Sequence, residues 1–240
     1  MWPATWGLGL HPLFISRIGQ DPESRPIHSF LEAWNLSSWG LQTDPHRPTG
    51  SVTISQEHED PCFAIPAGQA YDAVDADSAV RTAGASIGLL YHGTLALRDG
   101  SRNAWKRFCP EPRTLKLTRG ELAILTEQFC PHGTDPPRCL EIPGQRFGLQ
   151  EILLTQDRDG AIWWHAGELQ AIPTSPVRIR NTIGAGDAFT AGWLYGLYQK
   201  WDPLARLRFA ARLAAAVCTL PGALPYSPVF YAQLLEETEG

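Results

Sequence analysis

Asp187 lies directly after the glycine-rich stretch Gly184-Ala185-Gly186, and residues of these types in this order could transfer a phosphoryl group. Glycines let the backbone approach a ligand closely, and the first turn of a helix offers unpaired N–H groups and the positive end of its dipole. An aspartate beside such an anion cradle can take a proton from a hydroxyl, so the pattern favours phosphorylation of an alcohol. The same residues also fit a tight turn with an aspartate at the start of a helix.

The flanking residues predict the elements that position this loop. Val177–Arg180 is predicted to be a strand that enters it. Apolar residues at near-helical spacing from Phe189 to Tyr198 predict a helix that leaves it. A second helix is predicted over Pro203–Leu220, with a single apolar stripe made of Leu204, Leu207, Ala211, Ala214, Ala215 and Cys218.

The stretch from Asn181 to Gly192 reads N-T-I-G-A-G-D-A-F-T-A-G and resembles the second signature of the ribokinase, or PfkB, family of sugar kinases, D-T-x-G-A-G-D-A-F-x-A-G. Asn181 is the one departure, because the family usually has aspartate there. Carried over residue by residue, the resemblance implies that Asp187 is the catalytic base. It also implies that Gly184, Ala185 and Gly186 form the anion hole for the transferred phosphate.

Thr118 and Glu121 have the spacing of a capping box before a predicted helix. The resemblance places the family's N-x-x-E motif here, with Thr118 in place of the asparagine. It implies that Glu121 lies near magnesium, with the contact made through water. A helix cap and a magnesium contact are compatible, and both readings remain open.

The expected nucleotide site departs from the family pattern at one position. Glu151–Thr155 and Ala161–Trp164 are predicted strands around a turn at 157–160. In the family's T-x-G-x-x-G pattern, Thr155 and Gly160 fit, but Asp157 replaces the first glycine and would repel ATP phosphates unless it points away. The resemblance also implies that the turn at Gly222 lines the adenine pocket, although plain helix packing explains the nearby alanines equally well.

The remaining segments suggest an α/β protein. Leu13–Ile18 is predicted to be a strand and Ile27–Trp34 an amphipathic helix, and Ser51–Ser55 and Pro61–Ile65 are predicted to form a hairpin. Further predictions are strands at 87–91 and 113–117, helices at 102–108 and 227–236, and a proline-rich and glycine-rich loop at 130–145.

The resemblance implies a ribokinase-like three-layer sandwich with a mostly parallel central sheet. It predicts one domain over residues 1–240 with a small β lid insertion at about 42–70. Pro48-Thr49-Gly50 and Ala70-Tyr71-Asp72 resemble the entry to and the exit from this lid, which covers the sugar and joins two subunits as a homodimer in the family. An ordinary edge hairpin is the alternative for these strands.

The resemblance runs from Phe14 to Tyr231 and looks closest to bacterial fructokinase-like members. The chain is expected to be truncated relative to them, without the first strand, the G-G-x-x-x-N motif and a strand-helix unit before Leu115 that carries D-x-N-x-R. Two hypotheses follow. One is an ATP-dependent kinase of a sugar hydroxyl that uses Mg²⁺ and a monovalent cation. The other is a catalytically impaired pseudokinase or remnant that retains the fold and nucleotide or partner binding.

Composition excludes several other classes. The 240 residues are 43% hydrophobic and 19% charged, which is enough for a sizeable core. A net charge of −5 without a basic run argues against nucleic acid, and Arg206, Arg208 and Arg212 are interpreted as a solvated helix face. The absence of a signal peptide or an apolar span predicts a cytoplasmic protein with no membrane partner.

No other nucleotide or metal motif competes with this interpretation. The sequence has no G-x-x-x-x-G-K-[ST] motif, and Gly7 and Gly9 lack the third glycine of a dinucleotide site. The five cysteines are odd in number and have no C-x-x-C spacing, which disfavours a disulfide framework. Cys130, His132 and Cys139 match no usual zinc pattern.

Overall fold

The computed structural model divides the chain into two units, and each is described by itself. Unit 1 comprises Met1–Pro12 and Glu111–Gly240, and unit 2 is Leu13–Pro110. The structure describes residues 2–55, 62–84, 88–93, 101, 113–129, 136–225 and 227–239. No helix in these ranges is long and apolar enough to cross a membrane. The expected organisation, a single domain over residues 1–240 with a lid insertion at about 42–70, remains a prediction.

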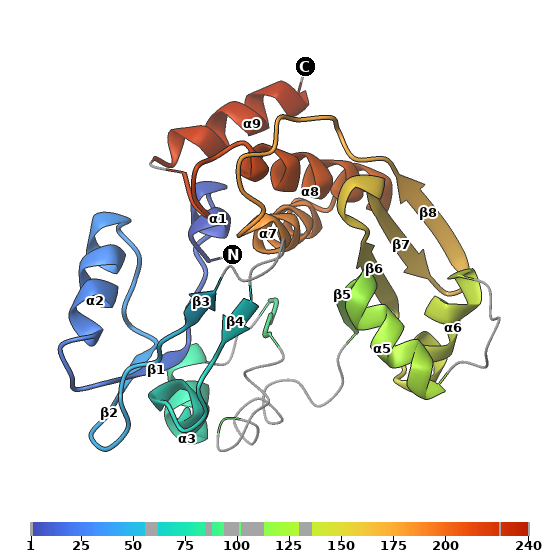
Figure 1. The fold of residues 1–240 in the computed structure, drawn as a ribbon. Coiled ribbons are helices and arrows are strands. Elements are labelled where there is room, and N and C mark those ends of the chain that lie inside the picture. Colours follow the sequence, from blue (N-terminus) through green and yellow to red (C-terminus); the bar gives the residue numbers. More distant parts are fainter. Residues whose placement is uncertain are drawn as a thin grey trace. The chain divides into compact units, whose positions relative to one another are not determined.

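A four-stranded sheet forms the centre of unit 1 (Figure 1). Its strands are β5 (Thr114–Thr118), β6 (Glu151–Thr155), β7 (Ala161–His165) and β8 (Glu168–Ile172), in that order. β5 and β6 are parallel, whereas β6, β7 and β8 pair antiparallel. The first three strands confirm the predicted ones, and β8 was not predicted. Ile152, Leu153 and Leu154 are all buried because β6 is covered on both faces.

Helices cover both faces of this sheet. On one face, Leu153 and Trp163 pack with Phe189, Trp193 and Leu207, which come from α7 (Ala185–Tyr198) and α8 (Pro203–Cys218). On the other face, Leu117, Ile152, Leu154 and Trp164 pack with Leu140 of α6 (Pro136–Arg146) and with Leu122 and Leu125 of α5 (Arg119–Phe129). The result is a helix-sheet-helix arrangement around one core on each side of the sheet.

Both predicted helices around the glycine-rich loop are present. Asp202 caps α8 by accepting hydrogen bonds from the amides of Leu204 and Ala205, and Pro203 occupies the first turn, where its missing N–H costs nothing. α7 and α8 approach closely at Gly192, where a Cβ would lie 2.8 Å from the Cα of Ala210.

The two terminal helices of unit 1 pack on each other. α1 (Trp2–Gly7) contacts α7 and α9 (Val229–Glu239), which confirms the predicted last helix with a shifted start. Gly7 faces the ring of Tyr231, which is fully buried, and a Cβ on Gly7 would lie 2.1 Å from that ring.

Unit 2 contains a parallel pair of strands and a separate hairpin (Figure 1). β1 (Ser16–Gly19) and β2 (Leu41–Asp44) are joined through α2 (Ser24–Ala33), which confirms the predicted strand and helix. β3 (Thr53–Ser55) and β4 (Cys62–Ala64) form the predicted antiparallel hairpin. A 3₁₀ helix, η1 (Ala70–Ala73), and α3 (Ala76–Ala83) follow it.

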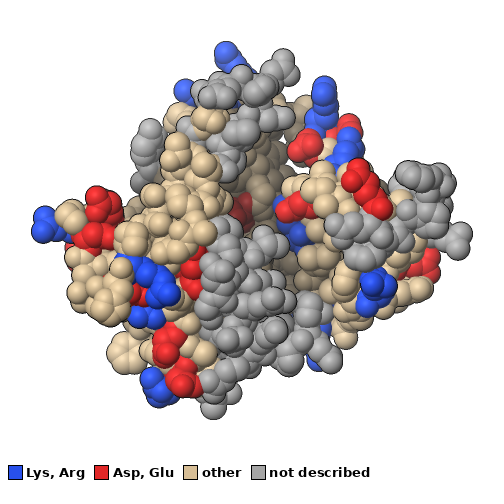
Figure 2. All heavy atoms as spheres, turned by 60° about the horizontal axis from the view of Figure 1, so that its bottom comes forward, with Lys and Arg blue, Asp and Glu red and all other residues tan. Residues whose placement is uncertain are grey.

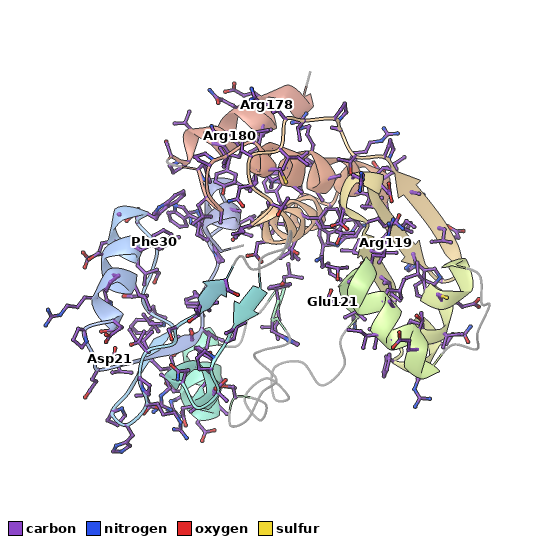
Figure 3. All side chains as sticks on the ribbon, viewed as in Figure 1. Asp21, Phe30, Arg119, Glu121, Arg178 and Arg180 are labelled. Atoms are coloured by element: carbon purple, nitrogen blue, oxygen red, sulfur yellow. The ribbon has the colours of Figure 1, made fainter. Side chains whose placement is uncertain are left out.

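The two ends of the predicted lid segment lie beside each other. The amide of Ala70 donates to the carbonyl of Pro48 at 2.9 Å, and Gly50 faces the ring of Tyr71. At the entry, the amide of Thr49 donates to Asp21 at 2.6 Å. The hydrogen bonds from Thr49 hold the pKa of Asp21, labelled in Figure 3, below its ordinary value. The segment therefore leaves and rejoins unit 2 at one fixed point.

One predicted strand starts later than expected, and others are absent from the described residues. β1 begins at Ser16, and Leu13 is 39% exposed. Val177–Arg180 forms no strand, because Pro176 directly precedes it and no strand in the described residues pairs with it. Gly88–Tyr91 is also irregular. The helix predicted at 102–108 lies outside the described residues, as do Cys130 and His132.

The predicted loop at 130–145 contains a helix, α6, in its described part. Prolines at the first positions of a helix are tolerated because their missing N–H would have no partner there. Pro143 and Gly144 are buried, and a Cβ on Gly144 would lie 2.2 Å from the ring of Trp164. Packing on the sheet therefore outweighs poor helix propensity.

The arginines of α8 are not the solvated face that the sequence indicated. Arg206 is only 8% exposed, stacks on Trp193 with 4.5 Å between its Cζ and the ring centroid, and lies 3.9 Å from Glu151. Arg212 donates to the carbonyl of Leu234. Arg208 alone of the three is exposed. The long apolar stems of arginine allow such burial when the charge finds aromatic and acidic neighbours.

Candidate active site

The loop before α7 is built by local hydrogen bonds. The side chain of Asn181 accepts from the amide of Ile183 at 2.9 Å, so it performs the turn-forming role that an aspartate could also perform. Gly184 is the N-cap, with a left-handed φ of 87°, and its carbonyl accepts from Ala188 at 2.8 Å. The loop therefore enters α7 directly.

One backbone amide in the first turn of α7 has no acceptor among the described residues. The amide of Ala185 donates to Thr182, whereas no described residue accepts from the amide of Gly186. Gly186 and Asp187 are exposed, and the next residues, Ala188 and Phe189, are buried. The geometry thus provides an open helix N-terminus with a carboxylate in its first turn, which suits an anion and a proton acceptor.

The predicted adenine turn lies against this loop. A Cβ on Gly184 would lie 2.6 Å from the carbonyl oxygen of Ala223, whereas one on Gly222 would meet nothing within 4 Å. The amides of Arg180 and Asn181 both donate to the carbonyl of Cys218, at 2.8 and 3.2 Å. The structure therefore brings the turn at Gly222 together with the anion loop.

The carboxyl ends of β5 and β6 lie side by side near the same helix. Thr118 and Thr155 are opposite each other in the parallel register, and the hydroxyl of Thr155 donates to the carbonyl of Leu117 at 3.3 Å. Lys116 shares the strand face of Thr118, and its Nζ lies 3.5 Å from the position of a Cβ on Gly186. Ligands of open α/β sheets commonly bind at such strand ends. Lys116 was not predicted, although period-two alternation within Thr114–Thr118 places residues 116 and 118 on one face.

Glu121 confirms the predicted capping box. Its Oε2 accepts from the amide of Thr118 at 2.7 Å and from the Thr118 hydroxyl at 2.9 Å, while that hydroxyl accepts from the amide of Glu121. In the described part of the chain, no cluster of three metal-binding side chains exists. Mg²⁺ commonly takes one or two carboxylates together with phosphates and water. Glu121 fits that form, because only one of its oxygens is used by the cap.

The turn after β6 has a strained residue. Asp157 lies in η3 (Asp157–Asp159) with a positive φ of 52°, is exposed, and its carbonyl accepts from Thr174 at 3.0 Å. Gly160 has a φ of 103°, and a Cβ there would lie 1.9 Å from the carbonyl oxygen of Ile172. Backbone crowding alone therefore requires a glycine at position 160.

A surface ion pair ties this turn to α5. Arg119 lies 2.7 Å from Asp159 (Oδ2), and Figure 3 shows Arg119 and Glu121 at the start of α5. The pair joins the two segments that follow β5 and β6. The sequence does not predict this ion pair, because Arg119 and Asp159 are far apart in the chain and belong to no shared motif.

Every residue predicted for the phosphate, nucleotide and magnesium sites belongs to unit 1. The structure joins Gly184 with Ala223, Gly186 with Lys116, and Thr118 with both Thr155 and Glu121. Arg178 and Arg180, labelled in Figure 3, are exposed on the segment that leads to the loop. Figure 2, which shows a different side of the molecule, has acidic and basic residues interspersed on its described surface.

Comparison with known proteins finds relatives among carbohydrate kinases. A family model described as "pfkB family carbohydrate kinase" matches residues 67–228. An uncharacterized sugar kinase of Archaeoglobus fulgidus is 24% identical over 88% of this chain and 92% of its own.

Two solved structures share the fold. The fructokinase of Vibrio cholerae O395, solved with fructose, ADP and a calcium ion, matches with a TM-score of 0.75 and 21% identity, over 97% of this chain and 88% of that one. The ribokinase of Thermotoga maritima matches with a TM-score of 0.73 and 17% identity, over 98% and 84%. These likenesses confirm the predicted ribokinase-like α/β fold.

Proposed function

Because the chain belongs to the pfkB family of carbohydrate kinases, we propose that it transfers the terminal phosphoryl group of ATP to a hydroxyl of a sugar, with fructose as the first candidate. One observation carries this proposal. The open first turn of α7 presents the amide of Gly186 and the exposed carboxylate of Asp187 together.

The residues of unit 1 suit an in-line transfer. The amides of Gly184, Ala185 and Gly186, with the helix dipole behind them, would hold the transferred phosphoryl group. Asp187 would accept the proton of the attacking hydroxyl while the sugar oxygen bonds to phosphorus and the bond to the leaving oxygen of ADP breaks. Positioning supplies much of the rate in such reactions, so rigid placement of this turn matters.

We also propose nucleotide and metal sites near the ends of β5 and β6 and near the anion loop. We assign nucleotide contacts to Thr155, Gly160 and Gly222, and a water-mediated magnesium contact to Glu121. Bound Mg²⁺ would neutralise charge on the ATP phosphates. The Vibrio fructokinase, as a double mutant, was also solved with fructose, ADP and a potassium ion, which supports testing a monovalent cation here. We also propose a cytoplasmic homodimer that pairs through β3 and β4.

The test is Asp187→Asn in purified protein, assayed with ATP, Mg²⁺ and a panel of ketoses and aldoses. We expect kcat to fall by about 10²–10⁴-fold, because the amide cannot accept the proton. ATP affinity by calorimetry should stay close to that of the unsubstituted protein.

The matched control is Glu168→Gln, which changes an exposed carboxylate. Glu168 is paired with His165, and His165 is paired with Glu151 at the start of β6. Glu168 therefore lies at the opposite end of the sheet from Thr155, which ends β6. This variant should turn over normally. Equal turnover of the Asp187 variant and its control would contradict the proposed base.

A second candidate, a catalytically impaired pseudokinase, is favoured by Asp157. This exposed carboxylate occupies the left-handed position of the nucleotide turn, where the family pattern has glycine. ATP binding without turnover of any sugar in the panel would support this candidate against the kinase. Absence of both heat and thermal shift with ATP would contradict the kinase and would leave only a structural or partner-binding role.

A further inference from the structure

Lys116 is placed beside the anion loop by the register of the sheet. Its strand partner is Leu153, which packs under α7 and α8, whereas the adjacent pair, Leu117 and Leu154, packs under α5 and α6. Because side chains alternate along a strand, Lys116 lies on the α7 face. Its Nζ is 3.5 Å from the position of a Cβ on Gly186, and apart from the neighbours of Gly186 in the chain no other described side chain lies within 4 Å of that position.

The charge of Lys116 is not used within the described part of the chain. No described carboxylate lies within ion-pair distance of its ammonium, in contrast to Arg119 and Arg206, which pair with Asp159 and Glu151. Its side chain is half-buried, so the stem packs on the sheet and the ammonium reaches the first turn of α7. A cation beside the amide of Gly186, which has no described acceptor, reinforces the same preference for an anion.

We propose that Lys116 binds the terminal phosphoryl group of ATP at the Gly186 turn and stabilises that group during transfer. This inference rests on the proposed kinase function. The amide of Gly186 fixes one oxygen, and the ammonium, a compact charge on a flexible stem, follows the group as it moves from ADP to the sugar oxygen. ADP lacks the group that Lys116 contacts, so Lys116 favours ATP over ADP.

The experiment compares Lys116→Met with Lys200→Met. Methionine keeps most of the apolar stem of Lys116 and removes the charge. Lys200, exposed and beyond the C-terminal end of α7, is the matched control. Calorimetric titration with ATP and with ADP is run on both, with thermal unfolding as the check on folding, and turnover is measured on the sugar panel.

We expect Lys116→Met to weaken ATP binding about tenfold while ADP binding changes little, because one charge-assisted hydrogen bond is lost. Its kcat should fall on the order of 10²-fold, as when one donor of an oxyanion site is removed. Lys116→Arg should recover part of both losses, and Lys200→Met should lose neither.

The outcomes separate the two proposals. Equal ATP affinity and equal turnover of the Lys116→Met and Lys200→Met variants overturns the role of Lys116 and leaves the kinase standing. If the unsubstituted protein binds ATP but phosphorylates no sugar, the kinase proposal fails, and the selective loss of ATP over ADP still decides for or against Lys116. Failure of the unsubstituted protein to bind ATP overturns both.

Discussion

Glycines of the nucleotide and phosphate motifs serve different physical needs. Gly184 and Gly160 have left-handed backbones and lie against carbonyl oxygens, so any side chain would be strained and would clash. Gly222 meets nothing within 4 Å, and Gly186 meets only the end of Lys116. Packing therefore explains the first two, while the open space at the last two is available to a ligand.

Asp157 gives a prediction at the residue scale. Asp157→Asn removes its charge and keeps a residue that tolerates the left-handed region, whereas Asp157→Gly also removes the strain. Both variants should bind ATP a few-fold more tightly, because a carboxylate no longer repels the phosphates. Only the glycine variant should gain stability, by about 1 kcal/mol. Calorimetry and urea denaturation measure the two effects, and unchanged ATP affinity in both variants would show that Asp157 faces away from the nucleotide.

Local side-chain patterns were predictable, and long-range partners were not. The capping box of Thr118 and Glu121 follows from spacing alone and is confirmed. Arg206 looked like a surface residue because its helix carries other arginines. Its burial depends on Trp193 and Glu151, which come from other elements. Lys116 was missed for the same reason, since Gly186 lies 70 residues away along the sequence.

At the scale of elements, the contact of α7 with α8 depends on Gly192, the last glycine of the signature. Gly192→Ala should destabilise the protein by about 1–3 kcal/mol, because the added methyl lies 2.8 Å from the backbone of Ala210 and overpacks the interface. Higher helix propensity offsets at most about 1 kcal/mol. Urea denaturation measures the difference.

Gly120 is the matched control for this substitution, because it lies in α5 with nothing within 4 Å of its Cβ position. Gly120→Ala should be neutral or slightly stabilising. A stabilising effect at both glycines would contradict the claim that Gly192 sets the distance between the helices. Gly192 would then need another role in the signature.

The elements that were predicted correctly have strong local signals. α2 and α8 have helical periodicity, and β6 and β7 are apolar segments around a clear turn. α6 has the opposite composition, and it is helical because Pro143 and Gly144 fit against the sheet at Trp164. Val177–Arg180 has strand-like residues but no partner strand. In both segments, contacts with residues far away in the sequence determine the secondary structure, and local sequence patterns do not reveal those contacts.

At the scale of the whole molecule, Tyr231 joins the first and last helices of unit 1. Burial raises the pKa of Tyr231 from 10.0 to about 12. Its contribution to the free energy of unfolding is therefore complete below pH 10 and is lost as the pH rises through 12, by up to roughly 3 kcal/mol. Tyr231→Phe should remove this part of the alkaline loss, measured by urea denaturation at pH 8, 10 and 11.

Below pH 10, Tyr231→Phe should be neutral or stabilising, because no described residue bonds to the buried hydroxyl. Tyr198→Phe is the matched control, since Tyr198 is 69% exposed, and it should leave the pH dependence unchanged. An identical alkaline loss in the Tyr231 and Tyr198 variants would rule out Tyr231 as its source.

Unit 1 is discontinuous, with Met1–Pro12 on one side of unit 2 and Glu111–Gly240 on the other. During synthesis on the ribosome, α1 emerges before unit 2, whereas its partners in α7 and α9 begin to emerge roughly 180 residues later. Unit 2 leaves the exit tunnel before the sheet of unit 1 has been made. The apolar face of α1 therefore remains exposed to solvent, or bound to a chaperone, until α9 has been synthesised. Completion of unit 1, which contains the phosphate site, is accordingly a late step in the folding of each chain.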